Sequence, residues 1–182
     1  MARNKVSYHI MKNKPITIRG LKLRDIPKLY KMYGSLSEES KRFFHPFPES
    51  VLSISFWLTW ILLALSCIGC LREILLRILP FPVYISICSL YSDELIGFAF
   101  ISFRSKLYGT LGIVVRDDFQ GIGVGSKLMR YLIILAGREG FRKIRLTVLT
   151  DNHKAIKLYE KFGFKKIKFI KDCGIYKGKT IV

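Results

Sequence analysis

The hydrophobic residues of this chain recur at spacings that predict short strands alternating with helices. Two runs rich in β-branched and aromatic residues, Val83–Ser89 and Leu95–Phe103, flank the turn-like residues 91–94 and predict a β-hairpin. Further strands are predicted at Ile16–Arg19, Thr110–Val115, Ile144–Leu149 and Phe164–Ile170. Helices are predicted at Asp25–Tyr33, Gly123–Gly140 and Asn152–Phe162.

One segment departs from this alternation. Val51–Leu71 runs for 21 residues without a charge, and about 20 apolar residues are enough to cross a bilayer. The segment lies inside the chain and follows a basic stretch, which excludes a secretory signal peptide. The plainest alternative is a buried core helix.

Length and composition indicate a folded single domain, and the net charge indicates the kind of partner it binds. The 182 residues predict one domain spanning 1–182, and the hydrophobic half of the composition excludes a disordered chain. The formal net charge of +18 indicates an anionic partner. That charge divides into +8 over residues 1–48, zero over 49–82 and +10 over 83–182. A neutral apolar insert at 49–82 therefore interrupts a basic protein.

A glycine-rich turn follows the strand predicted at Thr110–Val115 and leads into the next helix. Glycines let the backbone approach a ligand closely, and free N–H groups with the helix dipole favour a phosphate at such a helix start. The turn lacks the G-x-G-x-x-G pattern of dinucleotide sites, because Ser126 stands where the third glycine belongs. It also lacks the G-x-x-x-x-G-K-[ST] pattern of nucleoside-triphosphate loops.

Two motifs together resemble those of the GNAT N-acetyltransferases. Gln120-x-x-Gly123-x-Gly125 resembles the acetyl-coenzyme A motif of that family. The block Asn152-x-x-Ala155-x-x-x-Tyr159-x-x-x-Gly163-Phe164 follows at the spacing that the family uses. The resemblance covers about residues 15–48 and 83–170. It implies an α/β (α+β) fold with a mixed, mostly antiparallel central sheet flanked by helices, and leaves 49–82 as an apolar helical insertion.

The resemblance also implies roles for individual residues. Tyr159 would act as the general acid that protonates the departing thiolate, with a packed core aromatic as the alternative. Asn152 would bind the pantetheine arm or orient the acetyl end. Main-chain N–H groups of the strand would stabilise the developing oxyanion. The residues implied in binding acetyl-coenzyme A, the co-substrate, are Ile113, Val114 and Val115 along the strand and Gln120, Gly121, Ile122, Gly123, Val124, Gly125 and Ser126 around the pyrophosphate.

Two features depart from the family pattern. Many relatives carry a glutamate base in the stretch matching residues 110–112, where this chain has Thr110. Glu38, Glu39, Asp93 and Asp172 are the other candidates, and the base stays open. The residues after 170 are few and poorly suited to a strand, so the closing strand of the family is expected to be shortened or missing.

The expected function is acetyl-coenzyme A-dependent acetylation of an amine, on a protein or a small molecule. A non-catalytic coenzyme A-binding module is the alternative. Nucleic-acid binding alone is disfavoured, because no basic stripe studded with aromatic residues is found. Cys67 and Cys70 have the C-x-x-C spacing but lie in an apolar run with no second pair of ligands nearby, so no metal is expected.

The apolar insert raises a topological question. If Ile16–Arg19 and Val83–Ser89 share one sheet, both lie on the same side of any membrane. Two crossings need roughly 40 apolar residues, and only 31 positions separate Glu49 from Phe81. We therefore expect residues 51–79 to lie in the interface of an anionic membrane, on the cytoplasmic side. The alternatives are a soluble lid, a contact between copies of the chain in an oligomer, and a true span.

Overall fold

The computed structural model describes residues 15–44, 83–170 and 180–181. Its main sheet has five strands in the order β1-β2-β3-β4-β5, antiparallel except that β4 and β5 run parallel. The strands are β1 (Thr17–Gly20), β2 (Val83–Tyr91), β3 (Glu94–Ser105), β4 (Tyr108–Val115) and β5 (Lys143–Arg145). The expected mixed, mostly antiparallel sheet is confirmed.

The predicted hairpin forms β2 and β3. Its turn places Ser92 at φ 49° and Asp93 at φ 67°, the left-handed conformations that a two-residue hairpin turn needs. The central strand β3 is buried from Leu95 to Ile101. A strand covered on both faces reads as a continuous apolar run instead of an alternating one, as the sequence around Phe98 does.

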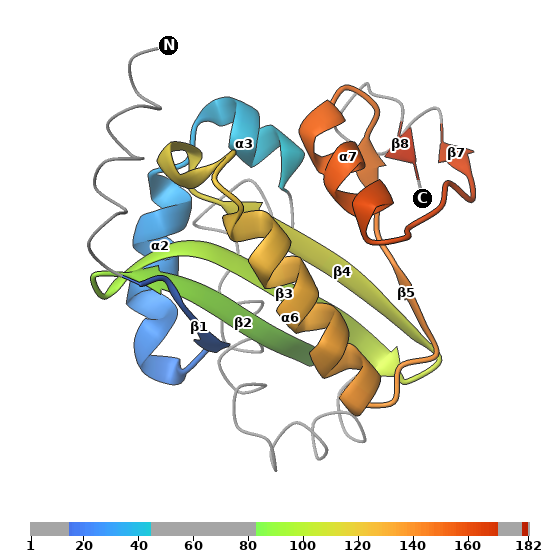
Figure 1. Cartoon of the computed structure of the whole chain (residues 1–182), viewed down its shortest axis with the longest axis horizontal. Helices are drawn as coiled ribbons and strands as arrows, with labels where there is room; N and C mark the ends of the chain where they lie inside the picture. The colour runs from blue at the N-terminus through green and yellow to red at the C-terminus, as the bar shows by residue number, and fades with distance from the viewer. Residues whose placement is uncertain (1–14, 45–82, 171–179, 182) are drawn as a thin grey trace, which may run out of the picture.

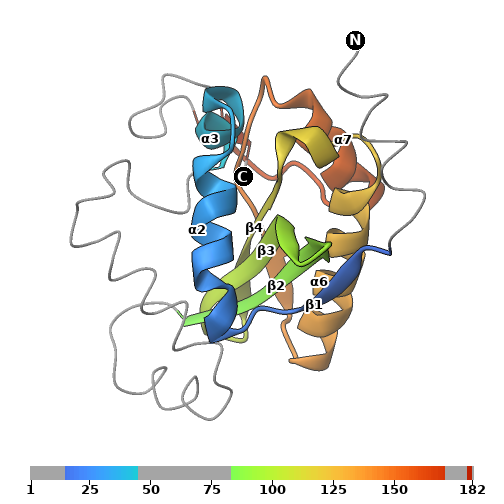
Figure 2. The ribbon, with the colours of Figure 1, turned by 90° about the vertical axis from the view of Figure 1, so that its left-hand side faces the viewer.

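Helices cover both faces of this sheet. Figure 2 shows α2 (Ile26–Gly34) on one side of the strands and α6 (Val124–Arg138) on the other. Two separate hydrophobic clusters result. One packs Leu128, Met129 and Leu132 of α6 against the sheet, and the other packs Leu29 and Met32 of α2 against its opposite face.

Two further helices and a small sheet lie at one end of the molecule. The helices are α3 (Glu38–Phe43) and α7 (His153–Lys161), and α7 packs beside a three-stranded sheet (Figure 1). That sheet has the order β6-β8-β7, with β8 antiparallel to both neighbours. Its strands are β6 (Val148–Leu149), β7 (Phe169–Ile170) and β8 (Thr180–Ile181). The closing strand is thus present and shortened.

Two strand predictions were wrong in extent. The single strand expected at Ile144–Leu149 is divided into β5 and β6, which belong to different sheets. The strand expected at Phe164–Ile170 is reduced to β7, because the lysine-rich stretch before it pairs with no described strand. The first change opens the main sheet beside β4.

The apolar insert at 49–82 lies outside the described residues. Within the described part of the chain, no helix combines the length and the apolar character needed to cross a bilayer.

Candidate functional site

One edge of β4 is only partly paired. Its antiparallel partner β3 runs along the whole strand, whereas β5 pairs with Tyr108, Gly109 and Thr110 alone. The chain then turns into β6, which pairs with β8 instead. From Leu111 to Val115, no strand of the described residues lies on that side of β4. This stretch includes the predicted Ile113, Val114 and Val115.

The register shows which backbone groups face this open edge. The Arg116 N–H donates to the Ile96 carbonyl at 2.9 Å, and residues of an antiparallel strand alternate in facing their partner. Val114 therefore bonds to β3, while Ile113 and Val115 direct their N–H and C=O groups outward. The Val115 carbonyl accepts a bond of 3.0 Å from the Gln120 side chain.

The glycine-rich turn follows immediately and has the backbone that the sequence suggested. Gly121 lies at φ +78° and Gly123 at φ +90°, a region that side-chain-bearing residues rarely adopt. A Cβ added at either glycine would meet nothing within 4 Å. The turn therefore presents bare backbone beside open space.

The start of α6 continues this surface. Gly123 is the N-cap and has no side chain to accept a bond from the helix. The first bond of the helix runs from Lys127 N–H to the Gly123 carbonyl, so the N–H groups of Val124, Gly125 and Ser126 have no helical partner. The backbone N–H of Gln120, in contrast, donates to the backbone carbonyl of Asp117 at 3.3 Å. The first turn of α6 is thus suited to an anion.

The second motif lies on α7, which packs against the same region. A Cβ on Gly125 would lie 3.5 Å from Leu158 Cδ2 and 3.8 Å from Val115 Cγ2, so α7, α6 and β4 meet there. Asn152 is the N-cap of α7, and its Oδ1 accepts the Ala155 N–H at 3.1 Å. Its amide NH₂ group retains two donors for other partners.

Tyr159 lies on α7 with its ring edge-on to Phe164, the centroids 6.0 Å apart. Burial raises the pKa of its hydroxyl to about 12. The hydroxyl therefore keeps its proton throughout the neutral range, as a general acid must.

Two of the candidate general bases are carboxylates held in ion pairs, whereas Glu39 is exposed and forms no ion pair with a described residue. Glu38 lies 2.9 Å from Lys41 and Asp93 lies 2.5 Å from Lys28. Thr110 accepts a long bond of 3.4 Å from Arg145. Asp172 lies outside the described residues, and the base stays open.

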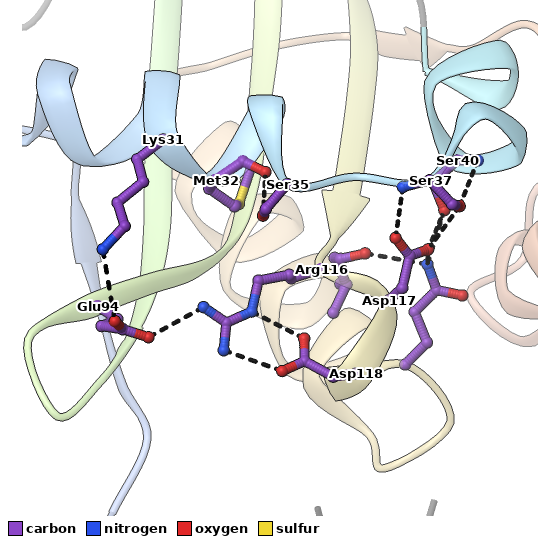
Figure 3. A network of polar contacts seen from close by, with 11 residues as sticks. Lys31, Met32, Ser35, Ser37, Ser40, Glu94, Arg116, Asp117 and Asp118 are labelled. Carbon is purple, nitrogen blue, oxygen red and sulfur yellow. Dashed lines mark hydrogen bonds and ion pairs between the residues drawn. The ribbon is translucent and has the colours of Figure 1, made fainter. Parts of the chain in front are cut away.

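A polar network that the sequence did not predict joins α3 to the glycine-rich turn (Figure 3). Asp117 accepts a bond of 2.8 Å from the Ser37 N–H, a bond of 3.2 Å from the Ser37 hydroxyl and a third from the Ser40 hydroxyl. Gln120 donates to Ser40 at 3.1 Å and to Asp117 at 3.2 Å. The N-terminus of α3 is thereby fixed to the residues that precede the turn.

The charge on Asp117 supports this role. Burial opposes its ionisation, but the hydrogen bonds from Ser40 and Ser37 outweigh that effect and hold the pKa of Asp117 below its usual value. The neighbouring Arg116 is engaged separately: it binds Asp118 at 2.7 and 3.0 Å and Glu94 at 3.0 Å (Figure 3).

A second contact ties the other end of α3 to α7. Arg42 lies 2.6 Å from Asp151, directly before the N-cap Asn152. The six-residue helix α3 is therefore held at one end by the glycine-rich turn and at the other by the start of α7. Ser37 followed by Glu38 and Glu39 is a local signal for the helix start, but partners 77 to 109 residues away leave no local pattern.

Comparison with known proteins decides the family. The model of the acetyltransferase (GNAT) family matches residues 39–164, more than half of the chain. The chain belongs to the GNAT acetyltransferase family. The resemblance seen in the two motifs is thereby confirmed.

Individual relatives agree with this assignment. The GNAT chain is 40% identical over 53 residues to acetyltransferase Pat of Mycolicibacterium smegmatis, a match covering 29% of this chain and only 16% of that protein. Its fold is similar to the ribosomal-protein-S18-alanine N-acetyltransferase of Escherichia coli, with TM-score 0.61, 21% identity and coverage of 92% and 90%. It is also similar to yncA from Salmonella typhimurium, solved with its cofactor acetyl-CoA, with TM-score 0.66, 18% identity and coverage of 91% and 90%.

The network around Asp117 gives a first prediction for this GNAT chain. Asp117→Ala removes the acceptor for Ser37 and Ser40, so the amides of residues 37–43 should exchange with solvent at least tenfold faster, as roughly 1.4 kcal/mol of lost protection implies. Hydrogen exchange followed by mass spectrometry measures this. Asp118→Ala is the matched control, because Asp118 binds Arg116 and not α3. Equal exchange in the two variants would contradict the role assigned to Asp117.

Proposed function

We propose that the protein transfers the acetyl group of acetyl-coenzyme A to an amine, by direct attack of that amine on the thioester. The observation that carries the proposal is the open edge of β4, followed a few residues later by the bare backbone of Gly121 to Gly123 and the N–H groups of α6 that have no helical partner. An extended amide chain can pair with such an edge, and a diphosphate suits such a helix start.

Acetyl-coenzyme A supplies the acetyl group in an activated form. The outward N–H and C=O groups of Ile113 and the outward Val115 N–H bind the pantetheine arm, and the Ile113 N–H would stabilise the oxyanion that forms at the acetyl carbonyl. Val124, Gly125 and Ser126 hold the diphosphate through their N–H groups. Asn152 orients the arm with its amide NH₂ group.

Tyr159 provides the proton for the departing thiolate. Its hydroxyl makes no hydrogen bond with the described residues and remains protonated far above neutral pH. The attacking amine must lose its own proton first, because amines of lysine type are mostly protonated at pH 7. A water relay or a residue outside the described part of the chain would take that proton.

One observation favours a second candidate, a GNAT module that binds coenzyme A without catalysis. The position where many relatives carry a glutamate is Thr110, whose hydroxyl is engaged with Arg145. The acceptor pocket of such a module would have no need of a base. The two candidates differ in turnover and not in coenzyme A binding.

Thiol release from acetyl-coenzyme A separates the two candidates. We expect at least one member of a panel of peptide N-termini, lysine side chains, polyamines and amino sugars to raise thiol release at least tenfold above hydrolysis. Mass spectrometry should find the acetylated amine. If calorimetry shows acetyl-coenzyme A binding and no amine accelerates release, the module is the better description.

The acceptor is proposed only as a chemical class, and the cellular location is proposed from the sequence alone. The Escherichia coli neighbour is named for an alanine of ribosomal protein S18, and for this chain we propose only an amine. Association of the insert at 51–79 with an anionic membrane, on the cytoplasmic side, rests on its uncharged run Val51–Leu71 and on the basic charge that flanks the insert.

A further inference from the structure

A cavity of about 530 Å³ lies between the second half of α6, the strand β5 and the helix α7. It lies at the far end of α6 from the glycine-rich turn. Val124 at the start of the helix and Gly137 in the cavity wall are 13 residues apart, or about 20 Å along the axis. The cavity is therefore not the place proposed for the diphosphate.

The walls of the cavity are apolar. Ile133 and Ala136 come from α6, Ile144 from β5, Leu146 from the residues just after β5, and Ile156 from α7. Protein interiors hold few voids larger than a water molecule, whereas sites for small ligands commonly measure about 300–1,000 Å³. An apolar ligand is the occupant that such walls would favour.

One residue in the lining of the cavity has no side chain. Gly137 lies inside α6, and a Cβ added there would meet nothing within 4 Å. Glycine inside a helix costs about 1 kcal/mol relative to alanine, and no neighbouring atom in the structure requires it. A larger side chain at this position would therefore meet no atom at its first carbon.

The rim of the cavity is positively charged. Its basic members are Arg142, Lys143, Arg145, Lys165 and Lys166, all exposed. Glu160 is the acidic member of the lining. Lys165 and Lys166 form no ion pair with any described residue, so their charges are available to a ligand.

We propose that this cavity binds a free fatty acid, with its chain among the apolar walls and its carboxylate at the lysine-rich rim. If each carbon takes about the 30 Å³ of a water molecule, the volume corresponds to roughly 18 carbons, so a chain of about twelve to sixteen carbons fits. Lys165 and Lys166 pair with the carboxylate at the mouth. Tyr159, the general acid proposed above, is also part of the lining, so the site borders the place of acetyl transfer while lying apart from the diphosphate surface.

Calorimetry with dodecanoate below its micellar concentration tests the proposal. We expect saturable binding of one dodecanoate per chain. Dodecyltrimethylammonium, which has the same chain and the opposite charge, should bind at least tenfold more weakly. Butanoate should show no binding. Equal affinity for the two twelve-carbon probes, or several dodecanoates per chain, would overturn the proposal by indicating adsorption to a basic surface.

Two variants place the ligand in the cavity. Gly137→Trp fills the space from the wall and should weaken dodecanoate binding at least tenfold, while Gly34→Trp, at an equally open position in α2, should leave it unchanged. If Gly137→Trp does not melt cooperatively, Gly137→Leu replaces it. Lys165→Glu with Lys166→Glu should weaken dodecanoate and not the cationic probe. Wild-type affinity in the filled variant would refute the site.

Discussion

Replacing Gly123 with glutamate is expected to lower the affinity for coenzyme A at least a hundredfold. Gly123 lies at φ +90°, where any side chain is strained by about 1–3 kcal/mol. The new carboxylate would also lie beside the N–H groups of Val124 to Ser126 and bring negative charge to the positive end of the helix. Isothermal titration calorimetry with coenzyme A measures the change.

Two further variants make this result specific. Gly34→Glu carries the same change at a position in α2 with equal space and no link to the turn, and it should bind coenzyme A as the wild type does. Gly123→Ala introduces the strain without the charge and should lose less than the glutamate variant. A folded Gly123→Glu protein that binds coenzyme A within threefold of the wild type would remove the start of α6 from the site.

The elements with local signals were predicted well. The helix expected at Gly123–Gly140 is α6 (Val124–Arg138), and that expected at Asn152–Phe162 is α7 (His153–Lys161). Both have a cap residue at the predicted start, Gly123 and Asn152. Periodic apolar residues and cap residues act within a few positions of the chain. Helices that depend on them can therefore be predicted from the sequence alone.

The elements that were predicted wrongly or missed depend on contacts with residues distant in the chain. The division of the strand expected at Ile144–Leu149 follows from Val148 pairing with Ile181, more than thirty residues later, and no property of the strand itself encodes that choice. The short helix α3 has no periodic pattern over its six residues. Its position depends on Asp117 and Asp151, whose own neighbours in sequence predict only a turn.

In the candidate site, too, features with a local sequence signal were predicted and features set by distant contacts were not. The glycines at 121 and 123 could be predicted to have positive φ, because glycine is the residue that most readily adopts that conformation in a turn. The family resemblance implied that Ile113, Val114 and Val115 bind the co-substrate, whereas the open edge beside them follows in the structure from the separation of β5 and β6. The network of Asp117, Ser37 and Ser40 was not predicted, since hydroxyl and carboxylate residues 77 or more positions apart show no spacing rule.

Tyr159→Phe is expected to lower kcat at least a hundredfold, within the 10²–10⁴ range of general acid–base catalysis. The hydroxyl makes no hydrogen bond with the described residues, so its removal should leave both the melting temperature and the affinity for acetyl-coenzyme A unchanged. The ring contact with Phe164 is preserved in phenylalanine. Steady-state thiol release and calorimetry on the same preparation measure the two quantities.

The pH dependence separates a proton donor from a packing residue. With a pKa of about 12, Tyr159 stays protonated and its ionisation cannot reduce kcat below about pH 11. The wild-type rate should therefore rise with pH as the amine is deprotonated and show no alkaline fall up to pH 10. Tyr131→Phe, an exposed tyrosine on α6, should retain the wild-type profile. A wild-type kcat in Tyr159→Phe would mean that the ring packs against Phe164 and that water protonates the thiolate.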